Sequence, residues 1–194
     1  MLGFPLLLLY LLARILRNGR YGAHLAERFG FLPPTLEATS PGNIWLHAVS
    51  VGEVLSAVEL LHRLRAQIPA AGLYVSVTTL AGRAMAEQKL VGLADGVFYT
   101  PLDYVFAVRR VLRTVKPLLL MVMETEIWPN LFREAKRYGC GLMVVNGRIS
   151  DKAFPRYRAW RWFFRPVLEL PDLILAQTDT LRGRFLDAGA PPAK

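Results

Sequence analysis

Apolar residues recur along the chain with two alternating periods from residue 44 onward. Short runs of apolar residues, several of them β-branched, alternate with longer stretches in which apolar residues return every three or four positions, the spacing of an amphipathic helix. Six strands, each followed by a helix, favour a Rossmann-like α/β fold with a doubly wound parallel sheet. The expected strands are 44–49, 73–79, 96–99, 118–123, 141–145 and 173–176, and the expected helices are 53–68, 82–90, 104–115, 129–137, 153–168 and 179–188.

The segment around residue 50 joins the first expected strand to the first expected helix. Ser50 and Glu53 have the spacing of a capping box, in which the serine caps the helix and the glutamate bonds back toward it. A carboxylate in a first turn is also favoured by the helix dipole. The same position lies at the carboxyl end of a strand, where open α/β sheets bind ligands. Glu53 is therefore either a structural cap or a reactive carboxylate, and this segment alone leaves both interpretations open.

Polar residues follow the other expected strands at the corresponding point. If the strands are parallel, their carboxyl ends share one rim of the sheet. Residues at this rim include Thr78, Thr79 and Arg83 after the second strand, Asp103 after the third, Glu124 and Glu126 after the fourth, and Asn146, Arg148 and Ser150 after the fifth.

The fourth expected strand, Leu118 to Met123, is the most apolar of the six. We expect it at the centre of the sheet, covered on both faces. It leads directly into Glu124 and Glu126. A carboxylate at the end of a buried strand is unfavourable unless it is paired or poised for chemistry. The alternatives are a cap on the helix that begins at Pro129 and an ion pair with a nearby arginine.

Residues 2–16 are almost continuously apolar, and arginines follow them. The uncharged part is shorter than the roughly 20 residues of a spanning helix, and the flanking residues do not fit a signal peptide. We therefore predict that residues 1–34 form a membrane-associated helical segment, embedded in or lying on an anionic leaflet. The alternative is a buried core helix. The arginines concerned are Arg14, Arg17, Arg20 and Arg28.

The composition limits the possible classes of protein. With 194 residues, of which 53% are hydrophobic and 20% charged, the chain is globular and large enough for one α/β domain. The formal net charge of +9 calls for an anionic partner: nucleic acid, a membrane surface or a phosphorylated ligand. Cys140 is the single cysteine, and we expect it to be a small buried residue. The scattered histidines lack the spacing of metal ligands, so we expect no metal site.

Arginines alternate with aromatic residues in the expected helix 153–168. Arg158, Arg161 and Arg165 would line one side of that helix. Three interpretations stay open: aromatic residues that pack on the sheet beneath solvated arginines, a face that binds phosphate or a membrane surface, or a single-stranded nucleic-acid site. No recognisable nucleic-acid motif supports the third. The other side of the helix would carry Tyr157, Trp160, Phe164 and Val167.

Two segments resemble signatures of the bacterial 3-deoxy-D-manno-octulosonic acid (Kdo) transferases of lipopolysaccharide synthesis. They are His47-Ala48-Val49-Ser50-Val51-Gly52-Glu53 and Met123-Glu124-Thr125-Glu126-Ile127-Trp128-Pro129-Asn130. The resemblance covers essentially the whole chain, because further motifs fall in the order that the family shows. These are Glu27-Arg28-Phe29-Gly30, Thr78-Thr79, Gly82-Arg83, Pro101-Leu102-Asp103, Asn146-Gly147-Arg148 and Leu175-Ala176-Gln177.

The resemblance implies the N-terminal half of a GT-B glycosyltransferase, a fold with two Rossmann-like domains facing each other across a cleft. That family transfers Kdo from CMP-Kdo to a lipid A precursor with inversion, at the cytoplasmic face of the inner membrane, and holds neither a metal nor another cofactor. By motif, Glu53 matches the proposed general base and Glu124 a second glutamate that activity needs. We expect the acceptor to contact Ser50, Gly52, Thr79, Arg83, Arg148 and Lys152.

The chain departs from the family pattern in one respect. Residues 43–190 correspond to the acceptor-binding domain, and nothing in the chain resembles a nucleotide-sugar pocket. We therefore expect the C-terminal CMP-sugar domain to be absent from this chain and residues 1–194 alone to be inactive. The alternatives are a non-catalytic membrane- or lipid-binding module left after loss of the sugar-nucleotide domain and a basic nucleic-acid-binding α/β domain.

Overall fold

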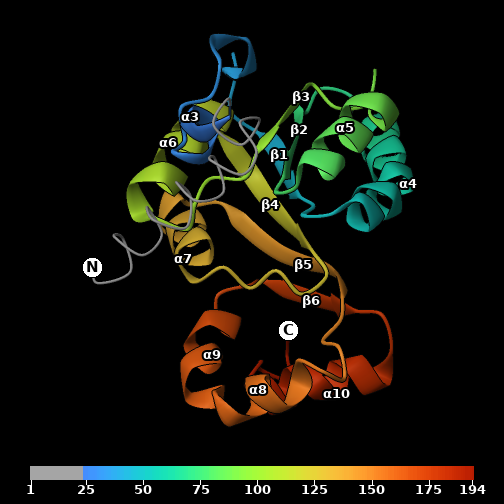
Figure 1. Cartoon of the computed structure of the whole chain (residues 1–194), viewed down its shortest axis with the longest axis vertical. Coiled ribbons are helices and arrows are strands. Elements are labelled where there is room, and N and C mark those ends of the chain that lie inside the picture. Colours follow the sequence, from blue (N-terminus) through green and yellow to red (C-terminus); the bar gives the residue numbers. More distant parts are fainter. Residues whose placement is uncertain (1–23) are drawn as a thin grey trace.

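A computed structural model describes residues 24–194 of the chain (Figure 1). The apolar run at residues 2–16, with most of the predicted membrane-associated segment, lies outside the described residues. Among residues 24–194, no helix combines the length and the apolar character that crossing a membrane requires.

The six predicted strands form one parallel sheet in the order β3-β2-β1-β4-β5-β6. This arrangement confirms the predicted Rossmann-like α/β fold, with β4 in the interior of the sheet as expected. The strands are β1 (Asn43–His47), β2 (Leu73–Val77), β3 (Gly96–Tyr99), β4 (Pro117–Met123), β5 (Gly141–Gly147) and β6 (Leu173–Ala176).

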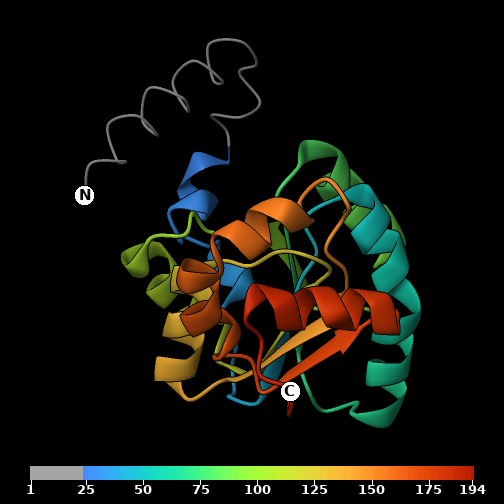
Figure 2. The ribbon, with the colours of Figure 1, turned by 90° about the horizontal axis from the view of Figure 1, so that it is seen from below.

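Helices pack on both faces of the sheet (Figures 1 and 2). Helices α4 and α5 contribute to the core on one face, whereas α6, α7, α9 and α10 contribute to the core on the other. The helices that follow the strands are α4 (Val51–Gln67), α5 (Leu80–Lys89), α6 (Val105–Val115), α7 (Pro129–Tyr138), α8 (Phe154–Ala159), α9 (Arg161–Leu168) and α10 (Asp179–Ala188).

Successive residues of a strand point alternately into these two cores. On β1, Leu46 packs against the α4 side while Trp45 packs against the α6 side, and both are fully buried. On β4, Leu120 faces the α6 side and Met121 the α4 side. Such double coverage explains the nearly continuous apolar strands. Cys140 is buried in the core on the α6 side, which confirms its predicted role.

Two helices begin earlier than the apolar spacing predicted because capping residues set their first turns. Ser50 caps α4 and Thr79 caps α5, each accepting a hydrogen bond from the backbone N–H three residues later. Strands β1 and β2 accordingly end at His47 and Val77, two residues before the predicted ends. The residues after both strands form the rim that carries the candidate site.

The prediction of a single helix over 153–168 was wrong. The backbone leaves the helical conformation at Trp160, which separates α8 from α9. Tyr157 and Phe164 still pack inward, with ring centroids 4.3 Å apart, so one apolar stripe runs through both helices. Trp160, expected on that stripe, is instead 53% exposed.

The first residues that the structure describes pack on the α/β body. Helix α3 (Leu25–Arg28) places the Glu27 carboxylate where it accepts the backbone N–H of Tyr99 in β3 at 2.8 Å. Arg28 is 7% exposed and donates to the Thr78 carbonyl oxygen at 2.7 Å, so this arginine is not available to a lipid surface. The chain that leads from α3 to β1 contains a short 3-10 helix, η1 (Pro34–Leu36), and Leu36 is buried.

Candidate active site

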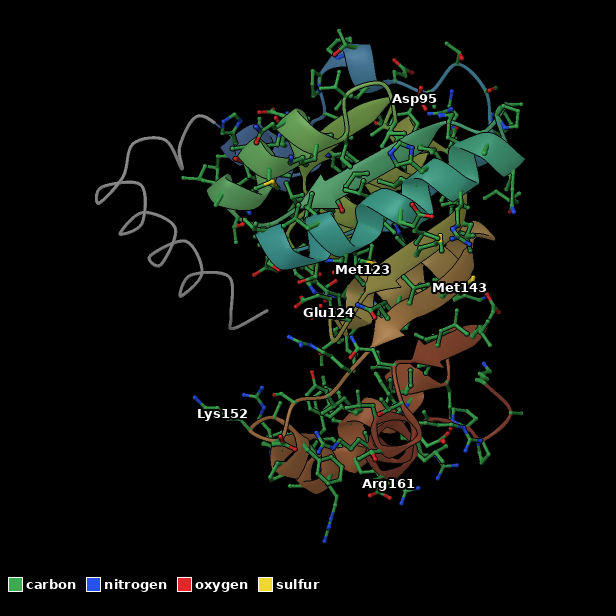
Figure 3. All side chains as sticks on the ribbon, turned by 90° about the vertical axis from the view of Figure 1, so that its right-hand side faces the viewer. Asp95, Met123, Glu124, Met143, Lys152 and Arg161 are labelled. Atoms are coloured by element: carbon green, nitrogen blue, oxygen red, sulfur yellow. The ribbon has the colours of Figure 1, made fainter. Side chains whose placement is uncertain are left out.

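The candidate site lies at the carboxyl ends of β1 and β4, where the strand order reverses. The chain leaves β1 into α4 on one face of the sheet and leaves β4 toward α7 on the other. In open α/β sheets, this switch point is where ligands bind. Glu53 follows β1, and Glu124 follows Met123 directly at the end of β4 (Figure 3). The two predicted catalytic residues therefore share the switch point.

Glu53 occupies the first turn of α4 and is only 6% exposed. Its Oε1 accepts a hydrogen bond from the Ser50 hydroxyl at 3.0 Å, and the Ser50 oxygen accepts the Glu53 N–H at 3.4 Å. Its Oε2 accepts the backbone N–H of Val49 at 2.9 Å. The predicted cap is confirmed, with the difference that the glutamate bonds the amide of Val49 in place of that of Ser50. This cap also fixes the carboxylate at the rim, so the structural and reactive interpretations are compatible.

Burial raises the pKa of Glu53 to about 7, because desolvation disfavours the charged carboxylate. The hydrogen bonds from Val49 and Ser50 act in the opposite direction, and the negative charges of Glu126 and Glu124 raise the pKa further. A carboxylate with a pKa near 7 suits general-base catalysis, since it is a stronger base than an exposed glutamate and is still substantially ionised near neutral pH.

Glu124 is paired with Arg148 across the ends of β4 and β5. The Arg148 Nε lies 2.9 Å from Glu124 Oε2, and their side chains are 54% and 18% exposed. Glu124, directly after β4, has a φ of 55°, and Asn146, the penultimate residue of β5, has a φ of 57°, so the backbone is left-handed near the ends of both neighbouring strands. Such conformations are unfavourable for residues other than glycine and often occur at functional sites. The ion pair that the sequence left open for Glu124 is therefore present.

Glu126 belongs to the same constellation. Its Oε2 accepts the indole N–H of Trp128 at 2.7 Å, which fixes the carboxylate beside the switch point. The Trp128 ring in turn contacts the ring of His47 edge-on, with centroids 5.3 Å apart. The loop between β4 and α7 is thus anchored on the last residue of β1.

His47 is fully buried, and burial lowers its pKa to about 3, with a hydrogen bond to the backbone of Ser76 acting in the opposite direction. Its Nδ1 lies 3.0 Å from the Ser76 hydroxyl and 3.2 Å from the Thr100 hydroxyl. Ser76 also accepts the indole N–H of Trp45 at 2.8 Å. His47 is therefore held among hydroxyl groups as a neutral ring. Within residues 24–194, its Nε2 has no hydrogen-bond partner.

Three of the six predicted acceptor-binding residues, apart from Arg83, lie at the rim with unlike surroundings. Thr79 caps α5 by accepting the Gly82 N–H at 2.9 Å. Gly52 is exposed, and a Cβ built there would meet only the Ser50 hydroxyl, at 4.0 Å. Lys152 is exposed and extends from the body in the loop before α8 (Figure 3). The other two predicted residues, Ser50 and Arg148, contact the two glutamates as described above.

Arg83 has partners within the chain. Its guanidinium contacts Glu27 at 3.0 Å and Glu87 at 2.6 Å, and its side chain is 18% exposed. It also lies over the Tyr99 ring at 5.3 Å from the centroid. Two carboxylates thus already neutralise this charge, and acceptor binding by Arg83 stays a prediction.

The sequence assigned no role to Glu126, Trp128 or His47 at the candidate site. The signal for Glu126 was present, because it lies two residues after Glu124 in the same motif. His47 stands in the other motif, but its contacts could not be predicted, since its hydrogen-bond partners come from β2 and from the residue after β3. Asp103, noted only as a rim residue, accepts the backbone N–H groups of Asn130 and Leu131 and so caps α7.

Residues 23–194 match the family described as 3-deoxy-D-manno-octulosonic-acid transferase (kdotransferase). Two curated relatives carry the name 3-deoxy-D-manno-octulosonic acid transferase. The relative from Haemophilus influenzae is 32% identical over 192 residues, and the relative from Chlamydia pneumoniae is 32% identical over 195 residues. Each match covers 98% of this chain and 44% of the relative, so the chain spans less than half of their length.

Among solved structures, a UDP-N-acetylglucosamine 2-epimerase is similar in fold, with a TM-score of 0.56. The two chains are 14% identical, and the match covers 79% of this chain and 45% of the epimerase. This likeness supports the Rossmann-like architecture and says nothing about the reaction.

Proposed function

The chain belongs to the Kdo transferase family, and on that premise we propose that it is the acceptor-side half of an inverting glycosyltransferase. The donor would be CMP-Kdo and the acceptor a lipid A precursor. The observation that carries this proposal is the position of Glu53 and Glu124 at the ends of β1 and β4, at the switch point of the sheet.

Glu53 would act as the general base. As the acceptor hydroxyl oxygen bonds to the anomeric carbon of Kdo, the proton of that hydroxyl passes to the Glu53 carboxylate. The bond between the anomeric carbon and the CMP phosphate breaks, and CMP leaves with the electron pair. Attack on the face opposite the leaving phosphate inverts the anomeric centre. The cap around Glu53 supports this role, because bonds from Ser50 and Val49 hold the carboxylate in one orientation.

Glu124 would position Arg148 for the acceptor. A guanidinium has five N–H donors, and the pair with Glu124 uses the Nε side, so most donors remain for a phosphate group of the lipid. The 54% exposure of the Arg148 side chain leaves it accessible. Lys152, exposed in the following loop, would supply a second cation.

The protein would work at the cytoplasmic face of the inner membrane, where both the lipid acceptor and the soluble donor are reached. The net charge of +9 favours an anionic membrane surface. Residues that hold most of the CMP-sugar would come from the part of the relatives' length that this chain does not span.

Mass spectrometry of the product tests this proposal. The full-length protein that contains this chain, incubated with CMP-Kdo and a lipid A precursor, should increase the mass of the lipid by Kdo residues. Replacing CMP-Kdo by a UDP-linked sugar should give no product. Transfer from the UDP-sugar in place of CMP-Kdo would contradict the assigned donor. A lipid that is bound without any mass change would favour a lipid-binding module.

A further inference from the structure

An exposed aromatic cluster lies on the α8–α9 pair. Trp160, Trp162 and Phe163 are 53%, 72% and 41% exposed. The ring centroids of Trp160 and Trp162 are 5.8 Å apart, and those of Trp162 and Phe163 are 6.0 Å apart, so the three rings form one continuous patch. Large aromatic side chains gathered in solvent are unfavourable unless something covers them.

The break at Trp160 produces this cluster. Tyr157 and Phe164 point into the core and hold both helices on the body, and Val167 and Leu168 anchor the end of α9. Trp160 lies between the two helices and turns outward with the first turn of α9. The buried core thus does not include the rings of Trp160, Trp162 and Phe163, which are therefore available to contact a partner.

Basic side chains lie on the same two helices as the cluster. Arg156, Arg158 and Arg161 are exposed, and among residues 24–194 none of the three forms an ion pair. Two nearby arginines differ: Arg165 pairs with Glu169 at 3.0 Å, and Arg184 pairs with Asp151. Arg161 lies on the outer part of the helical layer, and Lys152 extends from the loop before α8 (Figure 3). The patch therefore carries uncompensated positive charge beside exposed indoles.

We infer that the α8–α9 surface, defined as Arg156, Arg158, Trp160, Arg161, Trp162 and Phe163, docks on the headgroup region of an anionic lipid bilayer. Tryptophan prefers the membrane–water interface, where its apolar ring and polar N–H are both accommodated. Arginines at the same level attract anionic headgroups, and their aliphatic stems tolerate partial burial. The positive charge and the tryptophan rings of this surface thus both fit an anionic bilayer.

Single-stranded nucleic acid fits the surface less well. Such binding needs aromatic faces that are free for bases to stack on. Trp160 and Trp162 stack with an interplanar angle of 28°, so each indole covers part of the face of the other. An interfacial bilayer contact has no such requirement, because the rings need only enter the headgroup layer.

The inference deepens the proposed function by naming the surface through which the domain meets the membrane of its lipid acceptor. The experiment below measures membrane contact without any transfer reaction. The two proposals can therefore fail separately.

Tryptophan fluorescence in vesicles with brominated acyl chains tests the inference on the 194-residue chain. The vesicles contain phosphatidylethanolamine and phosphatidylglycerol, and bromine quenches indoles that enter the bilayer. Trp45 is fully buried in the core and Trp128 lies partly buried at the switch point, so quenching should come from Trp160 and Trp162. The variant W160F/W162F keeps an aromatic patch and should lose the quenchable emission.

A charge-matched pair of variants tests the arginines. R158Q/R161Q should lower the partition coefficient onto these vesicles about 10- to 30-fold, from the usual worth of a basic residue at an anionic surface. The control R63Q/R113Q removes two exposed charges from α4 and α6 and should lower it less than about threefold, since charges beyond a Debye length are screened.

Three results would overturn the inference. The first is a vesicle-bound chain whose Trp160 and Trp162 stay unquenched, which would assign attachment to the N-terminal segment or another surface. The second is equal weakening by the two charge variants. The third is a single-stranded oligonucleotide that changes the emission of these tryptophans at lower concentration than the vesicles do.

Discussion

Ser50 and Glu53 bond to each other in both directions: the Ser50 hydroxyl donates to Glu53 Oε1 at 3.0 Å and accepts the Glu53 N–H at 3.4 Å. The same contact begins helix α4 and fixes the carboxylate that we assign as base. A hydrogen bond to a carboxylate stabilises its charged form, so Ser50 tunes the basicity of Glu53 as well as its position.

The pH dependence of Kdo transfer should follow the ionisation of the Glu53 carboxylate. Its pKa of about 7 means that kcat/KM of the full-length protein should rise as the pH passes about 7 and then level off, because the base must be ionised. Ser50→Ala removes a bond that lowers the pKa, so the rise should move to higher pH. Glu126→Gln removes a charge that raises the pKa, so the rise should move to lower pH.

Ser56→Ala is the matched control for that pair. Ser56 lies on the same helix, and its hydroxyl donates only to the Gly52 carbonyl oxygen at 2.9 Å. The kcat/KM of Ser56→Ala should rise over the same pH range as that of the unchanged protein. Shifts of Ser50→Ala and Glu126→Gln in the same direction would contradict the electrostatic account of Glu53.

Replacing Gly52 by alanine should change stability and acceptor binding in opposite directions. The position is helical and has room for a methyl group, so Gly52→Ala should raise the free energy of unfolding by about 0.4–1 kcal/mol. The added methyl would stand at the open start of α4 beside Glu53, and we expect it to raise KM for the acceptor. Gly183→Ala in α10, which also has open space, should stabilise without any kinetic change. An unchanged KM for Gly52→Ala would remove Gly52 from the acceptor site.

The stability of the domain should depend on pH through Glu53 and His47 with opposite signs. Glu53 has its pKa raised from 4.5 to about 7, so the unfolded chain loses this proton first and stability falls as the pH rises through that window. His47 has its pKa lowered from 6.5 to about 3, so the unfolded chain gains a proton first and stability falls as the pH drops through that window.

Unfolding of the 194-residue chain at several pH values measures both effects. Glu53→Gln should gain stability relative to the unchanged chain as the pH rises from 4.5 to 7. His47→Gln should gain relative stability as the pH drops from 6.5 to 3. A stability difference for Glu53→Gln that stays constant between pH 4.5 and 7 would mean that the folded state does not raise this pKa.

The six strands and their shared rim followed from local patterns. Each parallel strand is buried on both faces, so its apolar run marks it in the sequence, and the polar residues after it must fall at one edge. The pairing of Glu124 with an arginine was among the expected alternatives for the same reason, since Arg148 follows the neighbouring strand. Capping residues such as Ser50 were also visible, because the cap is a contact between residues three apart.

Contacts between residues far apart in the sequence could not be predicted from local patterns. Arg83 was expected at the acceptor, but Glu27 from helix α3 reaches it across 56 positions. The helix break at Trp160 was hidden because Tyr157 and Phe164 keep one inward stripe through both helices. The burial of His47 and its contact with Trp128 depend on how β1, β2 and the β4–α7 loop pack together.

We assign Glu53 as the base, and the initial rate of Kdo transfer by full-length Glu53→Gln, measured together with its thermal unfolding midpoint, tests this role. Glutamine retains an oxygen for the Val49 N–H, so the fold should survive, while the proton acceptor is lost. The rate should fall by about 10² to 10⁴. Glu59→Gln, at an exposed position of the same helix, should keep its rate. A rate for Glu53→Gln within a few-fold of the unchanged enzyme, with the unfolding midpoint intact, would contradict the account.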